Sequence, residues 1–271
     1  MKLIESSVQI IEEKDPYKMI ELAGRTCYHS LDKITEDSSK EFVDRMIKLG
    51  HGAMLEHGTV YLTITATSPE VRKYEINPYS RVKKISVDGI NGRAYITTNY
   101  RVLVENKWLD DLKYQCDPTP SHEKCITVKF ICDRGVSHEF VRHRVFSFAQ
   151  ESQRYCNYSK DKFGNELTFI KPTWFEREGL NDNVNADFED QLIDTQERYF
   201  SMLALGLKPQ EARAILPNAI KTELVMTGFE SDWEHFFELR CSGAAHPDAK
   251  KLADELKSLM NVKNIELNSV K

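Results

Sequence analysis

The sequence contains no hydrophobic run that approaches the length of a membrane span. Its N-terminal stretch, MKLIESSVQIIEEKD, carries charges within the apolar run and lacks a small-residue cleavage site, so it does not resemble a secretory signal. The net charge of −5 provides no global field that would attract DNA or an anionic membrane, and any phosphate binding must come from local clusters of arginine. We therefore expect a cytoplasmic protein that binds neither nucleic acid nor a membrane.

Paired cysteines are also absent. None of the six cysteines belongs to a CxxC pair, and a chain of 271 residues with 41% hydrophobic content buries enough core to do without disulfides. We expect reduced thiols. Only Cys116, His122 and Cys125 approach the spacing of zinc ligands, whereas a structural zinc site needs four ligands, so we expect no metal.

Internal repeats and low-complexity tracts are missing as well. Strand and helix patterns are mixed without regular alternation, which favours an α+β fold in which a mixed or antiparallel sheet is flanked by helices. We expect a single domain over residues 1–271. The region at about 68–123 contains the turn signals NPYS, DGING and CDPTPSH, and we interpret it as an inserted, hairpin-rich region without catalytic residues.

The helices are predicted from their end signals and their apolar periodicity. Asp15 before Pro16 is typical of an N-cap followed by the first helical residue. Ser38 and Glu41 match a capping box, and Gly50 suits the left-handed residue that ends this second helix. Further helices are predicted at about 134–143, 188–206, 209–213, 232–240 and 247–260.

The strands are predicted from runs of β-branched and aromatic residues. TVYLTITAT at 59–67 and CITVKFIC at 125–132 are the strongest such runs. Asn91 and Gly92 lie between two further strand candidates and predict a hairpin turn. The segment 220–227 fits a strand or a helix equally well, so its structure stays open at this point.

Lysine is absent between Asp133 and Tyr155, although four arginines and two histidines occur there. Arginine presents a planar fork of donors that suits phosphate and ring carbonyl groups, whereas lysine is a point charge, so this choice favours oriented binding of an anion. The alternative is an ordinary surface network of salt bridges with Asp133, Glu139 and Glu151. The arginines concerned are Arg134, Arg142, Arg144 and Arg154.

The same stretch carries a longer pattern: RHR at 142–144 is followed, seven residues later, by SQRY at 152–155. This pattern resembles the signature of the flavin-dependent thymidylate synthases, the thymidylate synthase complementing protein family. Three further blocks resemble the family in the same order along the chain. They are GHGAMLEHGTVYLTI at 50–64, EARAILPNAIKTEL at 211–224 and FFELRCSGAAHPDA at 236–249, and DRGVSHEFVRHR at 133–144 extends the central motif.

The resemblance implies a methyltransferase that reductively methylates dUMP to dTMP. It implies FAD as cofactor, 5,10-methylenetetrahydrofolate and NADPH as co-substrates, and a homotetramer whose active sites form where subunits meet. In this family the reduced flavin supplies hydride and relays the one-carbon unit, so no protein thiol attacks the pyrimidine. Cys156, although close to the motif, therefore needs no catalytic role.

The resemblance also assigns roles to residues of this chain. Arg240 is expected to be catalytic, because a guanidinium that is always protonated stabilises the ionised N3 of uracil. The residues expected to bind dUMP are Glu139, Arg142, Gln150, Glu151, Ser152, Gln153, Arg154, Arg213 and Arg240. Those expected to bind FAD are His57, Thr59, Arg142, His143, Arg144, Val145, Gln150, Phe229, Ser231, His235 and His246.

Some positions have alternative interpretations. The chain has Ala149 and Gln150 where the family usually has Asn-Glu, which leaves open whether Gln150 or Glu151 takes the place of that glutamate. His57 is alternatively a histidine packed at the start of a strand, and His246 a cap of the following helix.

Two other functions are compatible with parts of the sequence. A non-catalytic nucleotide- or RNA-binding module would use the same arginines and would stack bases on nearby aromatic residues, against the net negative charge. A metal-dependent hydrolase would use histidines and Glu139, but the chain lacks HExxH. The aromatic residues are Phe146, Phe148 and Tyr155, and the histidines are His51, His57, His138 and His143.

Overall fold

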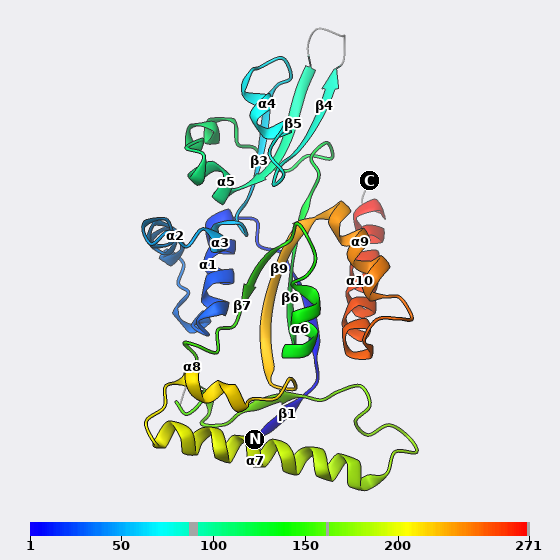
Figure 1. The fold of residues 1–271 in the computed structure, drawn as a ribbon. Coiled ribbons are helices and arrows are strands. Elements are labelled where there is room, and N and C mark those ends of the chain that lie inside the picture. Colours follow the sequence, from blue (N-terminus) through cyan, green and yellow to red (C-terminus); the bar gives the residue numbers. More distant parts are fainter. Residues whose placement is uncertain (87–91, 161–162, 270–271) are drawn as a thin grey trace.

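A computed structural model describes residues 1–86, 92–160 and 163–269, without the side chains of residue 182 and residues 263–269. Its centre is a four-stranded antiparallel sheet in the order β2-β6-β9-β7 (Figure 1). The predicted strand at 125–132 is confirmed, and the ambiguous segment 220–227 proves to be a strand. The strands are β2 (Ser7–Ile11), β6 (Cys125–Asp133), β9 (Lys221–Phe229) and β7 (Ser147–Gln150).

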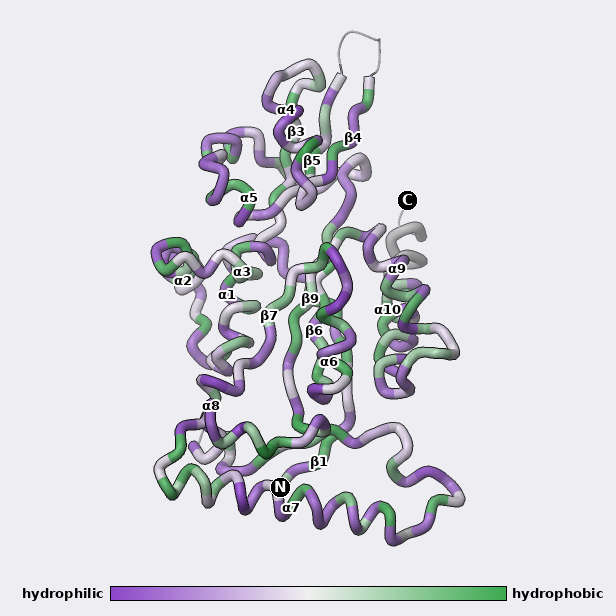
Figure 2. Tube along the Cα trace, in the orientation of Figure 1, coloured by the Kyte–Doolittle hydropathy of each residue, from purple (hydrophilic) through white to green (hydrophobic). Residues whose placement is uncertain are grey.

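One face of this sheet is apolar. Phe130 of β6 and Leu224 and Met226 of β9 are fully buried there, in one cluster with Trp233 and Leu252. Figure 2 shows hydrophobic residues along β6 and β9. The helices of this cluster are α6 (Arg134–Phe140), α9 (Glu230–Arg240) and α10 (Pro247–Ser269).

The other face is largely polar, because successive side chains of a strand point to opposite sides of a sheet. It carries Thr127 and Lys129 of β6 opposite Thr227 and Val225 of β9. Two helices, α1 (Pro16–Cys27) and α3 (Gly52–Leu55), contact β7 on this side, and Ala23 packs with Val225. One face of the sheet therefore buries apolar side chains, and the other buries mostly polar ones.

The helix predictions hold with local corrections. Asp15 caps α1 by accepting hydrogen bonds from the amides of residues 17 and 18, and Gly50 has φ 68° after α2 (Ser38–Lys48), as predicted. The capping box at Ser38 is wrong, because Asp37 precedes the helix without a side-chain bond to it. The Ser38 hydroxyl instead accepts a hydrogen bond from the Thr35 amide.

The inserted region forms a second sheet together with β3 (Thr59–Thr65), at the top of Figure 1. Leu62, Tyr74, Ile96 and Leu103 are fully buried in its separate hydrophobic cluster. Residue 91 of the predicted hairpin turn lies outside the described residues, but the flanking strands pair antiparallel from Ser86 and Gly92. The added elements are α4 (Glu70–Glu75), β4 (Arg81–Ser86), β5 (Gly92–Asn99), α5 (Tyr100–Glu105) and a 3₁₀ helix (Leu109–Tyr114).

A third layer lies at the bottom of Figure 1, where α7 runs below a parallel pair of strands. Leu192 and Tyr199 of α7 are buried in its cluster, and Gly206, with φ 98°, follows the helix as predicted. Most predicted helices are found, although α6 stops at Phe140, three residues early. The elements of this layer are β1 (Lys2–Ile4), β8 (Thr168–Ile170), α7 (Asp182–Ala204), α8 (Pro209–Ala212) and a 3₁₀ turn (Arg213–Ile215).

Candidate active site

The carboxylates near the arginine motif are engaged elsewhere. Asp133 accepts a hydrogen bond of 2.8 Å from a backbone amide in the first turn of α6 and so caps that helix. Glu139 pairs with Arg240, and Glu151 pairs with Lys221 at 2.8 Å. None of these three carboxylates is therefore the partner of an arginine within the motif.

Three of the four motif arginines are exposed. Within the described part of the chain, Arg142, Arg144 and Arg154 form no ion pair with a carboxylate. Arg144 donates to the Val141 carbonyl, and Arg154 lies 5.6 Å from the ring of the adjacent tyrosine. The alternative of an ordinary salt-bridge network is thus wrong for these arginines. Their positive charges remain available to an anionic ligand.

Arg240, at the end of α9, is held in one orientation. Its Nε donates to Nε2 of His143 at 2.9 Å, its Nη2 donates to the backbone carbonyl of Glu139 at 2.8 Å, and its Nη1 pairs with the Glu139 carboxylate. The pKa of His143 is lowered to about 4, mainly by burial, and the positive charge of Arg240 and the neighbouring His235 act in the same direction. The ring is therefore neutral at ordinary pH, and its unprotonated Nε2 accepts the bond from Arg240.

A cavity of about 500 Å³ lies beside this cluster and is lined by Glu139, Arg240, Ser242 and His246. Three of these four residues are predicted site residues, contributed by α6, α9 and the loop before α10. His246 also accepts a hydrogen bond of 3.3 Å from the Asp248 amide, so the ring caps α10 as the alternative interpretation proposed.

Gln150 and Glu151 point to opposite faces of the sheet. Gln150 pairs with Leu224 on the apolar face, and its amide donates to the Ser137 hydroxyl of α6 at 2.8 Å. Glu151 points to the polar face, where it bonds Lys221 and Tyr158. Because α6 also carries Glu139, the geometry puts Gln150, and not Glu151, on the side of the Arg240 cluster.

A second cationic site lies near the segment that follows β7. Burial lowers the pKa of Arg134, and the positive charge of Arg213 lowers it further, while Tyr158 opposes this effect. Two arginines from distant parts of the chain therefore interact electrostatically. Gln153, which is 9% exposed, has a buried Nε2 without a hydrogen-bond partner. Arg134 is not among the residues predicted to bind a ligand, although the arginine enrichment of the motif includes it.

His57 and Thr59 lie on the polar side of the sheet and line a cavity of about 520 Å³. The Nδ1 of His57 shares a hydrogen bond of 2.8 Å with the Thr227 hydroxyl, which bonds Thr127 at 2.8 Å. Burial lowers the pKa of His57 to about 4, and the nearby backbone of Phe148 only partly offsets this. Its Nε2 is buried without a well-formed hydrogen bond. The ring is thus a neutral, buried histidine at the start of β3.

Three of the remaining predicted flavin contacts, Val145, Phe229 and Ser231, lie near the inserted region. Arg81 stands 4.1 Å from the centre of the Phe229 ring, and Ser231 donates to the Glu123 carboxylate at 2.5 Å. Val145 and Phe229 line a small cavity together with Tyr79 of the inserted region. His235 is exposed. A single copy of the chain therefore does not gather all predicted flavin residues at one place.

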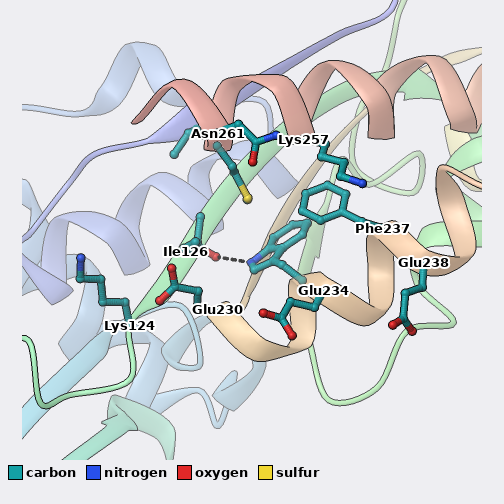
Figure 3. A pocket seen from close by; sticks show the side chains of 11 residues that line it. Lys124, Ile126, Glu230, Glu234, Phe237, Glu238, Lys257 and Asn261 are labelled. Atoms are coloured by element: carbon teal, nitrogen blue, oxygen red, sulfur yellow. Dashed lines mark hydrogen bonds between the residues drawn. The ribbon is translucent and has the colours of Figure 1, made fainter. Parts of the chain in front are cut away.

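A cavity of about 600 Å³ lies between α9 and α10 and contains none of the predicted site residues. Figure 3 shows Glu230, Glu234 and Glu238 along α9, with Lys257 and Asn261 on the facing helix. Its size alone does not make it the active site, because the motif arginines and Arg240 lie elsewhere.

The zinc ligands considered from spacing do not converge. The sulfur of Cys116 lies 4.0 Å from Nε2 of His122, but that nitrogen also bonds a backbone carbonyl at 3.0 Å. Among the described residues, the group close enough to share a metal is His29, Glu151 and Glu223. Lysines already pair with both of these carboxylates. This group shares none of its residues with the histidines of the proposed hydrolase.

The family model described as thymidylate synthase complementing protein matches residues 86–263, more than half of the chain. The chain belongs to this family. In the described residues, no helix is both long enough and apolar enough to cross a membrane. The predicted α+β class is confirmed.

Relatives in the thymidylate synthase complementing protein family carry a common name. The flavin-dependent thymidylate synthase of Geobacter sulfurreducens is 23% identical over 252 residues, which cover 91% of this chain and 78% of that protein. The enzyme of the same name from Pyrococcus abyssi is 30% identical over 122 residues, or 45% of this chain and 48% of the relative. A crystal structure of the UMP/dUMP methylase PolB from Streptomyces cacaoi aligns with a TM-score of 0.46 and 14% identity, over 96% of this chain and 91% of that one.

Proposed function

We propose that this protein is a flavin-dependent thymidylate synthase that converts dUMP to dTMP with 5,10-methylenetetrahydrofolate, FAD and NADPH. The observation that carries the proposal is the set of exposed motif arginines without carboxylate partners, in a chain that also fixes Arg240 beside an open cavity. Relatives named for this reaction in the same family support it.

The nucleotide phosphate fits the segment after β7. Ser152 offers a hydroxyl, Arg154 an exposed guanidinium, and Arg213 a second positive charge from the other half of the chain. Arginine binds phosphate through two parallel N–H donors, which fixes orientation as well as affinity. Arg142, Gln150 and Gln153 complete the proposed dUMP site, together with Glu139 near Arg240.

Arg240 is the proposed catalytic residue. Glu139 and His143 fix its guanidinium before the nucleotide binds, so little reorganisation is needed when negative charge develops on the uracil ring. The neutral His143 is essential to this arrangement, because a protonated ring would repel Arg240 and could not accept its hydrogen bond.

The residues present also fit a flavin. Arg142 and Arg144 are exposed donors for a diphosphate, and His143, Val145, Thr59 and His57 offer polar and apolar contacts. The bound flavin would supply the hydride chemistry. Because the proposed flavin residues lie on both faces of the sheet, we propose a homotetramer in which neighbouring copies complete each site, with each chain a single domain that carries the 68–123 insertion.

The test is NADPH oxidation by purified protein loaded with FAD. We expect oxidation that requires FAD and responds to dUMP, and release of tritium from dUMP labelled at uracil C5 when methylenetetrahydrofolate is added. A flavin-loaded sample that binds dUMP but neither oxidises NADPH nor releases tritium would overturn the proposal. A protein that shows no visible flavin absorption after loading would instead favour a nucleotide-binding module.

A further inference from the structure

The segment from Glu151 to Tyr158 contains the proposed phosphate-binding residues Ser152 and Arg154. Its two ends point into the protein: Glu151 is 2% exposed and Tyr158 is 6% exposed. Arg154, between them, is exposed. Gln153 and Cys156 are buried as well, so Arg154 and Tyr155 form the exposed part of a loop that is buried at both ends.

One carboxylate ties both ends of this loop together. Oε1 of Glu151 accepts a hydrogen bond of 2.9 Å from the Tyr158 hydroxyl, seven residues further along the chain. Oε2 accepts a hydrogen bond of 2.8 Å from Nζ of Lys221, on β9. The first bond closes the loop around Ser152 and Arg154, and the second attaches the closed loop to the central sheet.

The network continues on the polar face of the sheet and balances its own charge. Nζ of Lys221 also donates to Glu223 at 2.6 Å, and Lys129 pairs with the other oxygen of Glu223 at 2.5 Å. The Glu151 amide donates to the Glu223 carbonyl at 2.8 Å, so backbone and side chain are both fixed. Since two ammonium groups balance two carboxylates, the network offers no net charge to a ligand. It acts as a support.

We propose that Glu151 is a positioning residue, whose buried carboxylate holds Ser152 and Arg154 in the geometry that binds the phosphate of dUMP. This inference rests on the proposed function. A loop fixed in its binding conformation loses less conformational entropy when ligand arrives, so affinity for the nucleotide depends on the support behind it.

The chain offers a matched control in the inserted region. Asp111 is 5% exposed and, like Glu151, accepts from a tyrosine hydroxyl and pairs with a lysine. Its Oδ2 lies 2.5 Å from the hydroxyl of Tyr74 and 2.5 Å from Nζ of Lys73. Asp111→Asn and Glu151→Gln therefore remove the same kind of buried charge, but only Glu151 adjoins the proposed phosphate loop.

The experiment measures the Kd of dUMP by calorimetry, together with kcat and KM, for the flavin-loaded wild type and the variants. We expect Glu151→Gln to raise the Kd and KM for dUMP at least tenfold, with kcat within twofold at saturating dUMP. Asp111→Asn should leave the Kd within twofold. Tyr158→Phe, which loses only the bond that closes the loop, should raise the Kd about threefold and serves if Glu151→Gln does not fold.

Each outcome decides the inference. If the wild type binds dUMP and both Glu151→Gln and Tyr158→Phe bind it equally well, Glu151 does not position the loop. An equal loss of affinity in Asp111→Asn would show a general effect of lost stability and would also overturn the inference. If the wild type itself does not bind dUMP, the proposed function fails first and the inference fails with it.

Discussion

The two faces of the central sheet differ in what they bury. The face toward α9 and α10 holds Phe130, Leu224 and Met226, all fully buried among apolar neighbours. The opposite face holds Lys129 and Glu223, joined to Lys221 and Glu151, and the pair Thr127–Thr227 with His57. Apolar burial contributes stability in proportion to area, whereas buried charges contribute it only while each has its partner.

Charged residues occur in two different arrangements on the two sides of the sheet. On the polar face every charge of the Glu151 network has a partner, so the network offers no net charge to a ligand. Beside the apolar face, Arg240 is held by His143 and Glu139 yet borders an open cavity. In the proposed function, the first cluster supports the site and the second takes part in it. Substitutions in the two clusters should therefore affect different properties, stability for the first and turnover for the second.

The largest effect is expected on stability, from Lys221→Met. The substitution leaves the carboxylates of Glu151 and Glu223 short of a partner on the polar face, and loss of one member of a buried ion pair costs about 3–5 kcal/mol. Denaturant unfolding measures the free-energy change. A loss below about 1 kcal/mol, the size typical of an exposed pair, would mean that solvent screens the network and that the two faces differ less than proposed.

The next effect is expected on turnover, from Arg240→Ala. Removal of one preorganised donor to a developing anion typically lowers kcat about 10²–10³-fold, or about 2.7–4 kcal/mol. Tritium release from labelled dUMP measures the rate, and circular dichroism checks that the fold is retained. Arg240→Lys is the control, because it keeps the charge but loses the fork that joins His143 and Glu139. Normal turnover in the alanine variant would remove the assigned role.

The smallest effect is expected from the titration of His143. Its pKa of about 4 in the folded protein lies below the ordinary value of 6.5, so between these values the unfolded chain takes up a proton and the folded protein does not. The contribution of His143 to the free energy of unfolding is therefore fully present above pH 6.5. It falls by roughly 1–3 kcal/mol as the pH drops to 4.

His143→Gln tests this titration, because glutamine can still accept a hydrogen bond from Arg240 but does not titrate. The unfolding free energy of the variant, measured by denaturant from pH 7 to 4, should fall less steeply than that of the wild type. His57, whose pKa is also about 4, is present in both proteins and cancels in the comparison. Identical slopes would show that folding does not shift the pKa of His143.

The sequence predicted those helix ends and strands that depend only on residues close together in the chain. The Asp15–Pro16 start of α1, the left-handed Gly50 and Gly206, and the strands β3 and β6 follow from residues that are neighbours in sequence. The segment that became β9 could not be assigned, because nearly all of its residues are buried and no alternation is visible. The capping box at Ser38 failed because Asp37 holds the cap position.

The sequence by itself determined the family, through the RHR motif and its ordered blocks, and the residue types available for binding an anion. The tertiary structure decided which of these residues lie together and which partner each side chain has. It turned Gln150 toward α6 and Glu151 toward Lys221, and it brought Arg240 to His143 across 97 positions of the chain. Which carboxylate satisfies which cation depends on strand register and helix packing, which no short stretch of sequence contains.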